Sequence, residues 1–294
     1  MTSPLISADE LLALQGSADA GTLRVLDARW QLGRSDGREQ YLAGHIPGAV
    51  FVDVENELAG HGAPEEGRHP LPSEADFQVA ARRWGIDQRT AVVVYDDARM
   101  LPASRLWWAL RRAGISDVRV LDGGWQQWLA AGGTVETGDV TVPAGTVSLA
   151  DAASDDVIGT DGAAQWPAHG VLVDVRAAER YRGESEPIDP RAGHIPGARN
   201  LPIGDLLDAD GRFRPPEELV RAFDDVGAND DIPIAAYCGS GITAAQFALA
   251  GAVIGRDVTV YPGSWSAWSN TSGLPVATGE DAGEPARGSA ADID

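Results

Sequence analysis

Cysteine is nearly absent from this chain, since Cys238 is the only one in 294 residues. It therefore has no partner for a disulfide within the chain and no second thiolate with which to share a metal ion, and we expect neither a metal nor another cofactor. A single unpaired cysteine favours a reducing compartment. Because most lone cysteines are small buried hydrophobes, the residues around Cys238 must decide whether it is reactive.

Basic residues, long apolar runs and a leader pattern are also lacking. Arginine and lysine total 23 against 44 acidic residues, a formal net charge of −21 at pH 7. This excess argues against nucleic acid and membrane surfaces as partners and favours a soluble, self-repelling monomer. No run approaches the roughly 18 apolar residues of a membrane span, and residues 1–10 have neither the basic start nor the apolar core of a signal peptide. We expect a cytoplasmic protein.

The context of Cys238 predicts a nucleophile. The sequence around it is Tyr-Cys-Gly-Ser-Gly-Ile-Thr-Ala, residues 237–244. An apolar run at 232–237 predicts a buried strand before the cysteine, and residues 243–250 predict a helix after it. The two glycines let the backbone curl so that N–H groups point inward, and these groups, with the helix N-terminus, would favour the thiolate. Open α/β sheets bind ligands where such a strand ends.

The second half of the chain repeats the order of patterns in the first. The sequence Gly-His-Ile-Pro-Gly-Ala occupies residues 44–49 and again 193–198, and a Trp-x-x-Trp pattern occupies 125–128 and again 265–268. Strand-like runs alternate with helix-like ones in both halves. This predicts an α/β protein built by tandem duplication of one domain, each copy a mainly parallel sheet with helices on both faces.

The expected organisation is two domains with a linker and a tail. We expect a first domain at residues 1–132, a linker at 133–150, a second domain at 151–277 and a disordered acidic tail at 278–294. Aligning the copies places Asp96 opposite Cys238, and Asp97-Ala98-Arg99 opposite Gly239-Ser240-Gly241. The first copy lacks the thiol and the glycines that would turn amides inward, so only the second is expected to be catalytic. His45 and His194 occur in both copies and are interpreted as loop-shaping residues.

These motifs together resemble the two-domain rhodanese family, sulfurtransferases whose N-terminal domain is inactive. The resemblance rests on the paired Gly-His-Ile-Pro-Gly-Ala loops, the Asp-Gly-Gly-Trp and Pro-Gly-Ser-Trp segments and the cysteine loop, and covers about residues 23–275. The uncharged loop is most like that of 3-mercaptopyruvate sulfurtransferases. The resemblance implies that Cys238 takes sulfur from a small anionic donor as a persulfide and passes it to cyanide or to a thiol, such as that of a thioredoxin-like protein. The loop residues that would hold the substrate are Gly239, Gly241, Ile242 and Thr243.

The resemblance also implies roles for residues outside the loop. Arg180 stands at the family's substrate-binding arginine, and a guanidinium can grip a carboxylate through two parallel hydrogen bonds. Ser240, His69 and Glu55 are implied as a Ser–His–acid relay, with glutamate where some members have aspartate. Many mercaptopyruvate enzymes have a second arginine after a Glu-Pro pair. Here isoleucine follows that pair, and whether the next arginine, Arg191, reaches the site is open.

Other interpretations remain beside this one. A thiosulfate:cyanide sulfurtransferase would use the same cysteine with another donor. A tyrosine-phosphatase-like enzyme would need an arginine six residues after the cysteine, and position 244 is alanine. A non-catalytic binding or sulfur-relay module would only accept sulfur from a partner. Without the resemblance, Arg180 would be taken for a surface arginine and His69 for a structural histidine.

Overall fold

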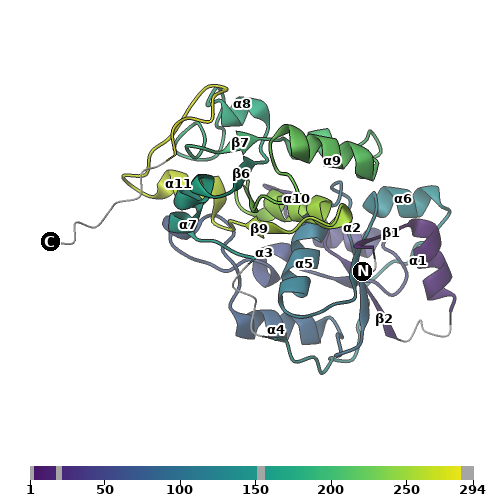
Figure 1. The fold of residues 1–294 in the computed structure, drawn as a ribbon. Coiled ribbons are helices and arrows are strands. Elements are labelled where there is room, and N and C mark those ends of the chain that lie inside the picture. The colour runs from purple at the N-terminus through teal and green to yellow at the C-terminus, as the bar shows by residue number, and fades with distance from the viewer. Residues whose placement is uncertain (1–2, 18–21, 151–155, 286–294) are drawn as a thin grey trace. The chain divides into compact units, whose positions relative to one another are not determined.

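The chain folds into two compact units, each an α/β layer structure (Figure 1). The computed structural model describes residues 3–17, 22–150 and 156–285. The first unit comprises Met1–His61, Leu71–Ala153 and Leu207–Arg214, and the second comprises Gly62–Pro70, Ser154–Leu206 and Pro215–Asp294. Each unit thus contains one short segment from the other half of the sequence. We call Gly62–Pro70 and Leu207–Arg214 the exchanged segments. The predicted domains were contiguous and did not include this exchange.

The first unit is built on a sheet whose order is β1-β5-β4-β2-β3. Its strands are β1 (Leu5–Ile6), β2 (Leu23–Asp27), β3 (Val50–Phe51), β4 (Ala91–Tyr95) and β5 (Val118–Leu121). All neighbouring pairs are parallel. Residues 92–95 of β4 are all buried. Because successive side chains of a strand point to opposite faces, this continuous burial shows that both faces of the sheet are covered.

Six α-helices are described in the first unit. They are α1 (Ala8–Gln15), α2 (Gly37–Ala43), α3 (Val54–Glu57), α4 (Glu74–Arg83), α5 (Leu101–Arg112) and α6 (Gly124–Ala130). Helix α5 packs on β4 and β5 and buries Leu106 and Leu110 completely. The apolar core also contains Leu11, Tyr95 and Trp128. Burial of such side chains stabilises the unit by roughly 1.5–3 kcal/mol each.

The second unit repeats this plan with a sheet of order β7-β6-β8-β9. The strands are β6 (Val171–Asp174), β7 (Arg199–Asn200), β8 (Ile234–Tyr237) and β9 (Val258–Val260), and every pairing is parallel. The α-helices are α7 (Thr160–Gln165), α8 (Ala178–Tyr181), α9 (Pro216–Asp225), α10 (Ile242–Val253) and α11 (Ser264–Asn270). Short 3₁₀ turns are η2 (Pro64–Glu66), η3 (Trp166–Ala168) and η4 (Ile203–Leu206). The predicted α/β duplication with parallel sheets is confirmed.

The repeated histidines hold corresponding loops in the two units. Nδ1 of His45 lies 2.9 Å from the carbonyl oxygen of Tyr41, and Nδ1 of His194 lies 2.8 Å from that of Tyr181. Each imidazole is fully buried and stacks on the ring of the same tyrosine. These contacts agree with the interpretation of both histidines as loop-shaping residues.

The predicted linker and tail both make backbone contacts. Val147, in the linker at 133–150, is buried, and its amide donates to the carbonyl of Ile86. The described start of the predicted tail at 278–294 makes two backbone hydrogen bonds: the Gly279 amide donates to the Arg182 carbonyl, and the Ala282 carbonyl accepts from the Gly197 amide. Backbone pairing anchors this stretch although its side chains are small. Residues 286–294 of the predicted tail lie outside the described residues. No helix in the described ranges is long and apolar enough to cross a membrane.

Candidate active site

The cysteine loop joins β8 to α10 at the carboxyl edge of the second sheet. Cys238 is buried, with 2% of its surface exposed, and its Sγ accepts a hydrogen bond from the Gly241 amide at 3.1 Å. Gly241 has a left-handed φ of 83°, and a Cβ there would collide with the Pro262 carbonyl. Ile242 begins α10, so the sulfur also lies near the N-terminus of a 12-residue helix. Both features stabilise a thiolate.

Ser264 supports the cysteine and was missed by the sequence reasoning. Its Oγ accepts from the Cys238 amide at 3.1 Å, donates to the Tyr261 carbonyl at 2.8 Å and lies 4.0 Å from Sγ. Ser264 has a φ of 53°, while Gly124 occupies the matching position of the first copy with a φ of 59°. A left-handed non-glycine residue costs roughly 1–2 kcal/mol. The signal available was the change from Asp-Gly-Gly-Trp to Pro-Gly-Ser-Trp between the copies.

His69 and Ser240 lie together although they are 171 residues apart in sequence. Nδ1 of His69 is 2.8 Å from Oγ of Ser240. The exchanged segment Gly62–Pro70 makes this possible, since it brings His69 into the second unit and its turn η2 packs on α11. Glu55, the third residue of the predicted relay, lies in the first unit, where its Oε1 accepts from Nε1 of Trp30 at 3.0 Å. Its part in a relay stays a prediction.

Arg180, on α8, approaches the cysteine loop. A Cβ built on Gly239 would lie 3.4 Å from Nη1 of Arg180. The guanidinium is not free, because its Nη2 donates to Oε1 of Glu186 at 2.6 Å and lies 3.4 Å from Oδ2 of Asp189. Arg191 is engaged elsewhere, since its guanidinium donates to the carbonyls of residues 268, 269, 271 and 274, around the end of α11.

Arg68 is a second arginine at the loop that the sequence reasoning missed. Its Nη1 donates to Oδ1 of Asp189 at 2.6 Å, and its Nη2 would lie 3.5 Å from a Cβ on Gly239. The partner Asp189 is 121 residues away in sequence. The one available signal was the position of Arg68 immediately before His69.

Arg180 and Arg68 belong to a chain of alternating charges that we call the ion-pair ladder. In order from the core outward it consists of Asp174, Arg176, Glu186, Arg180, Asp189 and Arg68, with successive N–O distances of 2.6, 3.2, 2.6, 3.4 and 2.6 Å. The exposed fractions of the side chains are 18% for Arg180, 25% for Arg68 and at most 3% for the other four. Burial alone would lower the pKa of Arg176, but the pairs with Asp174 and Glu186 outweigh it and raise that pKa. Arg176 therefore carries its charge although it is buried.

The corresponding loop of the first unit holds a carboxylate in place of the thiol. Asp96 is fully buried and accepts from the amides of Ala98, Met100 and Ala103 at 2.8–2.9 Å. The expectation that this loop cannot turn amides inward without glycines is wrong. Arg99 and Met100 adopt left-handed φ angles of 59° and 66°, so this loop turns its amides inward although it contains no glycine. Burial raises the pKa of Asp96 to about 7, against the effect of the three amides.

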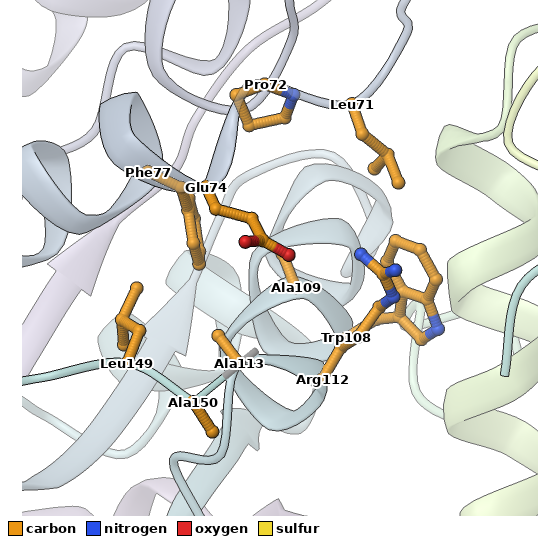
Figure 2. A pocket seen from close by; sticks show the side chains of 10 residues that line it. All are labelled: Leu71, Pro72, Glu74, Phe77, Trp108, Ala109, Arg112, Ala113, Leu149 and Ala150. Atoms are coloured by element: carbon orange, nitrogen blue, oxygen red, sulfur yellow. The ribbon is translucent and has the colours of Figure 1, made fainter. Parts of the chain in front are cut away.

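Two hollows of the first unit have no cysteine, serine, threonine or histidine among their lining residues. One, of about 610 Å³, lies beside the Asp96 loop between residues 29–40 and 97–101. The other is small, about 50 Å³, and Figure 2 shows its mainly apolar lining from α4, α5 and the chain at Leu149 and Ala150. Its only charged lining groups are Glu74 and Arg112. The cysteine loop of the second unit, by contrast, holds a thiol beside an amide donor and two guanidinium groups.

Comparison with known proteins agrees with this fold. The family model of the rhodanese-like domain matches the chain twice, over residues 7–131 and 160–271. The chain belongs to the rhodanese-like family. Because relatives that match nearly the whole chain are sulfurtransferases, the chain is a two-domain sulfurtransferase of this family.

Relatives resemble the chain over nearly its whole length. SseB of Mycobacterium tuberculosis, named only provisionally as a thiosulfate sulfurtransferase, is 45% identical over 94% of this chain and 97% of its own. The 3-mercaptopyruvate sulfurtransferase of Escherichia coli is 37% identical over 88% of this chain and 93% of its own. The crystal structure of SseA from Escherichia coli, described as a 3-mercaptopyruvate sulfotransferase, has a TM-score of 0.79 at 34% identity and covers 90% of this chain and 99% of its own. The names of these relatives point to two different donors.

Proposed function

We propose that the protein transfers sulfur from 3-mercaptopyruvate to a thiol or to cyanide through a persulfide on Cys238. One observation carries this proposal: Sγ accepts from the Gly241 amide at the N-terminus of α10, while guanidinium groups of Arg180 and Arg68 border the same loop. The amide and the helix stabilise the nucleophile. The arginines can bind the carboxylate of the donor.

The reaction divides into two displacements at sulfur. In the first, the Cys238 thiolate attacks the donor sulfur, a sulfur–sulfur bond forms, and the donor's carbon–sulfur bond breaks. The bonding electrons leave as the enolate of pyruvate, which then takes up a proton. In the second, the acceptor attacks the outer sulfur, the sulfur–sulfur bond breaks, and the Cys238 thiolate returns. The hydroxyl of Ser240, paired with Nδ1 of His69 at 2.8 Å, can relay the proton to the enolate.

Thiosulfate is the second candidate donor, favoured by the name of the Mycobacterium tuberculosis relative. The loop 239–243 contains no charged side chain, so thiosulfate, whose charge lies beside the reacting sulfur, would meet amides and Ser240 first. Mercaptopyruvate carries its carboxylate farther from the sulfur, where a guanidinium can hold it. We therefore expect a higher kcat/KM for mercaptopyruvate. Transfer within the cytoplasm, to small thiols or a thioredoxin-like protein, is part of the same proposal.

A steady-state comparison of the two donors with a common acceptor tests the proposal. Mass spectrometry of the intact protein after donor addition should show the gain of one sulfur atom on Cys238. The variant Cys238→Ser should gain none and should lose transfer to every acceptor, because a serine hydroxyl is far less ionised than a thiol. Retention of more than a few per cent of activity in that variant would exclude the persulfide mechanism, and a preference for thiosulfate would overturn the donor assignment alone.

A further inference from the structure

The outer end of the ion-pair ladder bears on which anion the site accepts. We propose that Asp189 is a specificity-determining residue: it joins Arg68 and Arg180 into one binding site and, by cancelling one of their charges, favours a monoanionic donor over a dianionic one. The inference rests on the proposed function, since it assumes that the donor binds beside Cys238.

The carboxylate of Asp189 forms ion pairs with Arg68 and Arg180 and contacts no other described charged side chain. Its Oδ1 lies 2.6 Å from Nη1 of Arg68, and its Oδ2 lies 3.4 Å from Nη2 of Arg180. Its side chain is 2% exposed, so water screens its charge little. Because Asp189 contacts both guanidinium groups, it holds them at a common distance from Gly239.

Donor groups remain for a ligand after these pairs are formed. A guanidinium has five N–H donors. Nη1 of Arg68 donates to Asp189. Nη2 of Arg68 lies next to the cysteine loop and makes no hydrogen bond to any residue that the structure describes. Arg180 commits Nε and Nη2 to acidic groups and leaves Nη1 at the loop. The two remaining nitrogens lie 3.4 and 3.5 Å from the same point on Gly239, which suits the two oxygens of one carboxylate.

The formal charge of the ladder is zero, because three arginines alternate with three acidic residues. When a monoanion binds at the outer end, the ladder and the ligand together carry one net negative charge. When a dianion binds there, they carry two, next to the Cys238 thiolate. Coulomb energy scales with the charge of the ligand. Any change of one unit in the charge of the ladder therefore affects a dianion about twice as strongly as a monoanion.

The outer ladder is not required by the fold itself. The first unit contains the equivalent of the inner pair: Asp27 lies 2.7 Å from Arg29, both are buried, and Asp27 also accepts a hydrogen bond from the hydroxyl of Tyr95. For Arg29 the described ion pairs stop at Asp27, and the first unit nevertheless forms a complete sheet. The extension to Asp189 and Arg68 occurs where the nucleophile is.

Two variants that change the ladder in opposite directions test the proposal. Asp189→Asn keeps the shape of the side chain and removes its negative charge, so the net charge of the ladder becomes more positive by one unit. The ratio of kcat/KM for thiosulfate to that for mercaptopyruvate should therefore rise about tenfold. Arg68→Gln removes one positive charge and should lower the same ratio. Glu184→Gln is the matched control, because it makes the same charge change as Asp189→Asn on an exposed residue whose partner is Arg182. Its ratio should stay that of the wild type.

A binding measurement separates this inference from the proposed function. The rate at which neutral iodoacetamide alkylates Cys238 is measured with increasing pyruvate, a monoanion, or sulfate, a dianion. Pyruvate should protect the wild type better than sulfate does, and Asp189→Asn should narrow or reverse that difference. This readout needs no turnover. If both donors fail as substrates while the protection pattern changes as stated, the proposed function is wrong, but the effect of Asp189 on which anion binds beside Cys238 is upheld.

Three results would overturn the inference. The first is an unchanged donor ratio and unchanged protection in Asp189→Asn, with thermal unfolding like that of the wild type. The second is a ratio that moves in the same direction in Asp189→Asn and Arg68→Gln, since a charge effect must have opposite signs. The third is an equal change in Glu184→Gln. If Asp189→Asn does not fold, Arg68→Gln, at the more exposed end of the ladder, decides by the sign of its ratio.

Discussion

The guanidinium of Arg180 is the residue-scale feature with the clearest kinetic consequence. Its Nη1 faces the loop while Nη2 is held by Glu186, so its orientation is set before a donor binds. Arg180→Lys should lower kcat/KM for mercaptopyruvate by roughly 1.5–3 kcal/mol, about tenfold to more than a hundredfold, because an ammonium group cannot reproduce the planar paired bonds. Steady-state kinetics measure the loss. Arg182→Lys, which changes a neighbouring arginine paired with Glu184, should leave the kinetics unchanged.

His69 and Ser240 should behave as one kinetic group. Because Nδ1 and Oγ are 2.8 Å apart, removing either group breaks the hydrogen bond that joins them. We expect His69→Ala and Ser240→Ala each to lower kcat by roughly 10²–10⁴-fold if the pair moves a proton, and the double variant to be little worse than either. A double-mutant cycle measures this coupling, with His61→Ala as the control on an exposed histidine. Strictly additive losses would mean that the two groups act separately.

Asp96 gives the stability of the protein a pH dependence of predictable sign. Burial raises its pKa in the folded chain to about 7, whereas the unfolded value is about 3.9. Between these values the folded state retains a proton that the unfolded state has released, so this carboxyl lowers stability as the pH rises from about 4 to about 7. The effect is on the order of a few kcal/mol and should vanish in Asp96→Asn.

Urea unfolding at pH 5 and pH 8 measures this effect. The stability of the wild type relative to Asp96→Asn should be lower at pH 8 than at pH 5. Asp225→Asn, at an exposed aspartate, is the control. The reverse order would show that the amides of Ala98, Met100 and Ala103 stabilise the ionised carboxylate more than burial opposes it.

Among the elements, the loop after β4 is closer to its catalytic counterpart than the sequence suggested. Asp96→Cys would place a thiol among three amides, although Ala98 stands where the second unit has Ser240. In a Cys238→Ser background we expect Asp96→Cys to react with iodoacetamide and still to show no sulfur transfer, since this loop has neither a hydroxyl–histidine pair nor the paired arginines. Alkylation rates and turnover assays measure the two properties. Turnover at residue 96 would contradict the requirement for these groups.

Much of each sheet could be predicted from local sequence, and several helices could not. The strands β4 and β8 are continuous apolar runs, which is the pattern of strands buried on both faces. Helix α1 was missed, although Ser7 and Glu10 form a capping box before it. Helix α9 was missed because its polar face hides the buried pair Leu219 and Phe223 from a search for apolar runs.

The site was predictable only where a motif carried it. Cys238 and Arg180 followed from their motifs, and both lie at the loop. A role for Asp189 could not be predicted, because it depends on the ion pair with Arg68. Arg68 lies 121 residues away in sequence, and a tertiary contact of that kind leaves no local pattern. The amides around Asp96 were misjudged for another reason: surrounding structure can hold non-glycine residues in a left-handed conformation that local preference disfavours.

At the scale of the whole molecule, the exchanged segments predict that the second half alone is not an enzyme. A fragment of residues 156–285 contains Cys238 but lacks Gly62–Pro70, and with it Arg68 and His69. It should show no measurable sulfur transfer even if circular dichroism shows a folded sheet. The control is the full chain cut at a protease site introduced at 151–155, which keeps every segment and should stay active. Full activity in the fragment would show that the exchanged segment is dispensable.

The same exchange affects how the gene can evolve. A tandem duplication normally leaves a spare copy that deletion can remove without loss. Here Gly62–Pro70 belongs to the first copy in sequence but folds into the second unit. Leu207–Arg214 belongs to the second copy in sequence but folds into the first unit. Deleting the first copy would therefore also remove His69, whose Nδ1 lies 2.8 Å from Oγ of Ser240. Selection for the chemistry of the second unit therefore also preserves the first half of the gene. A chain shortened to the second half alone would need another segment in the place of Gly62–Pro70.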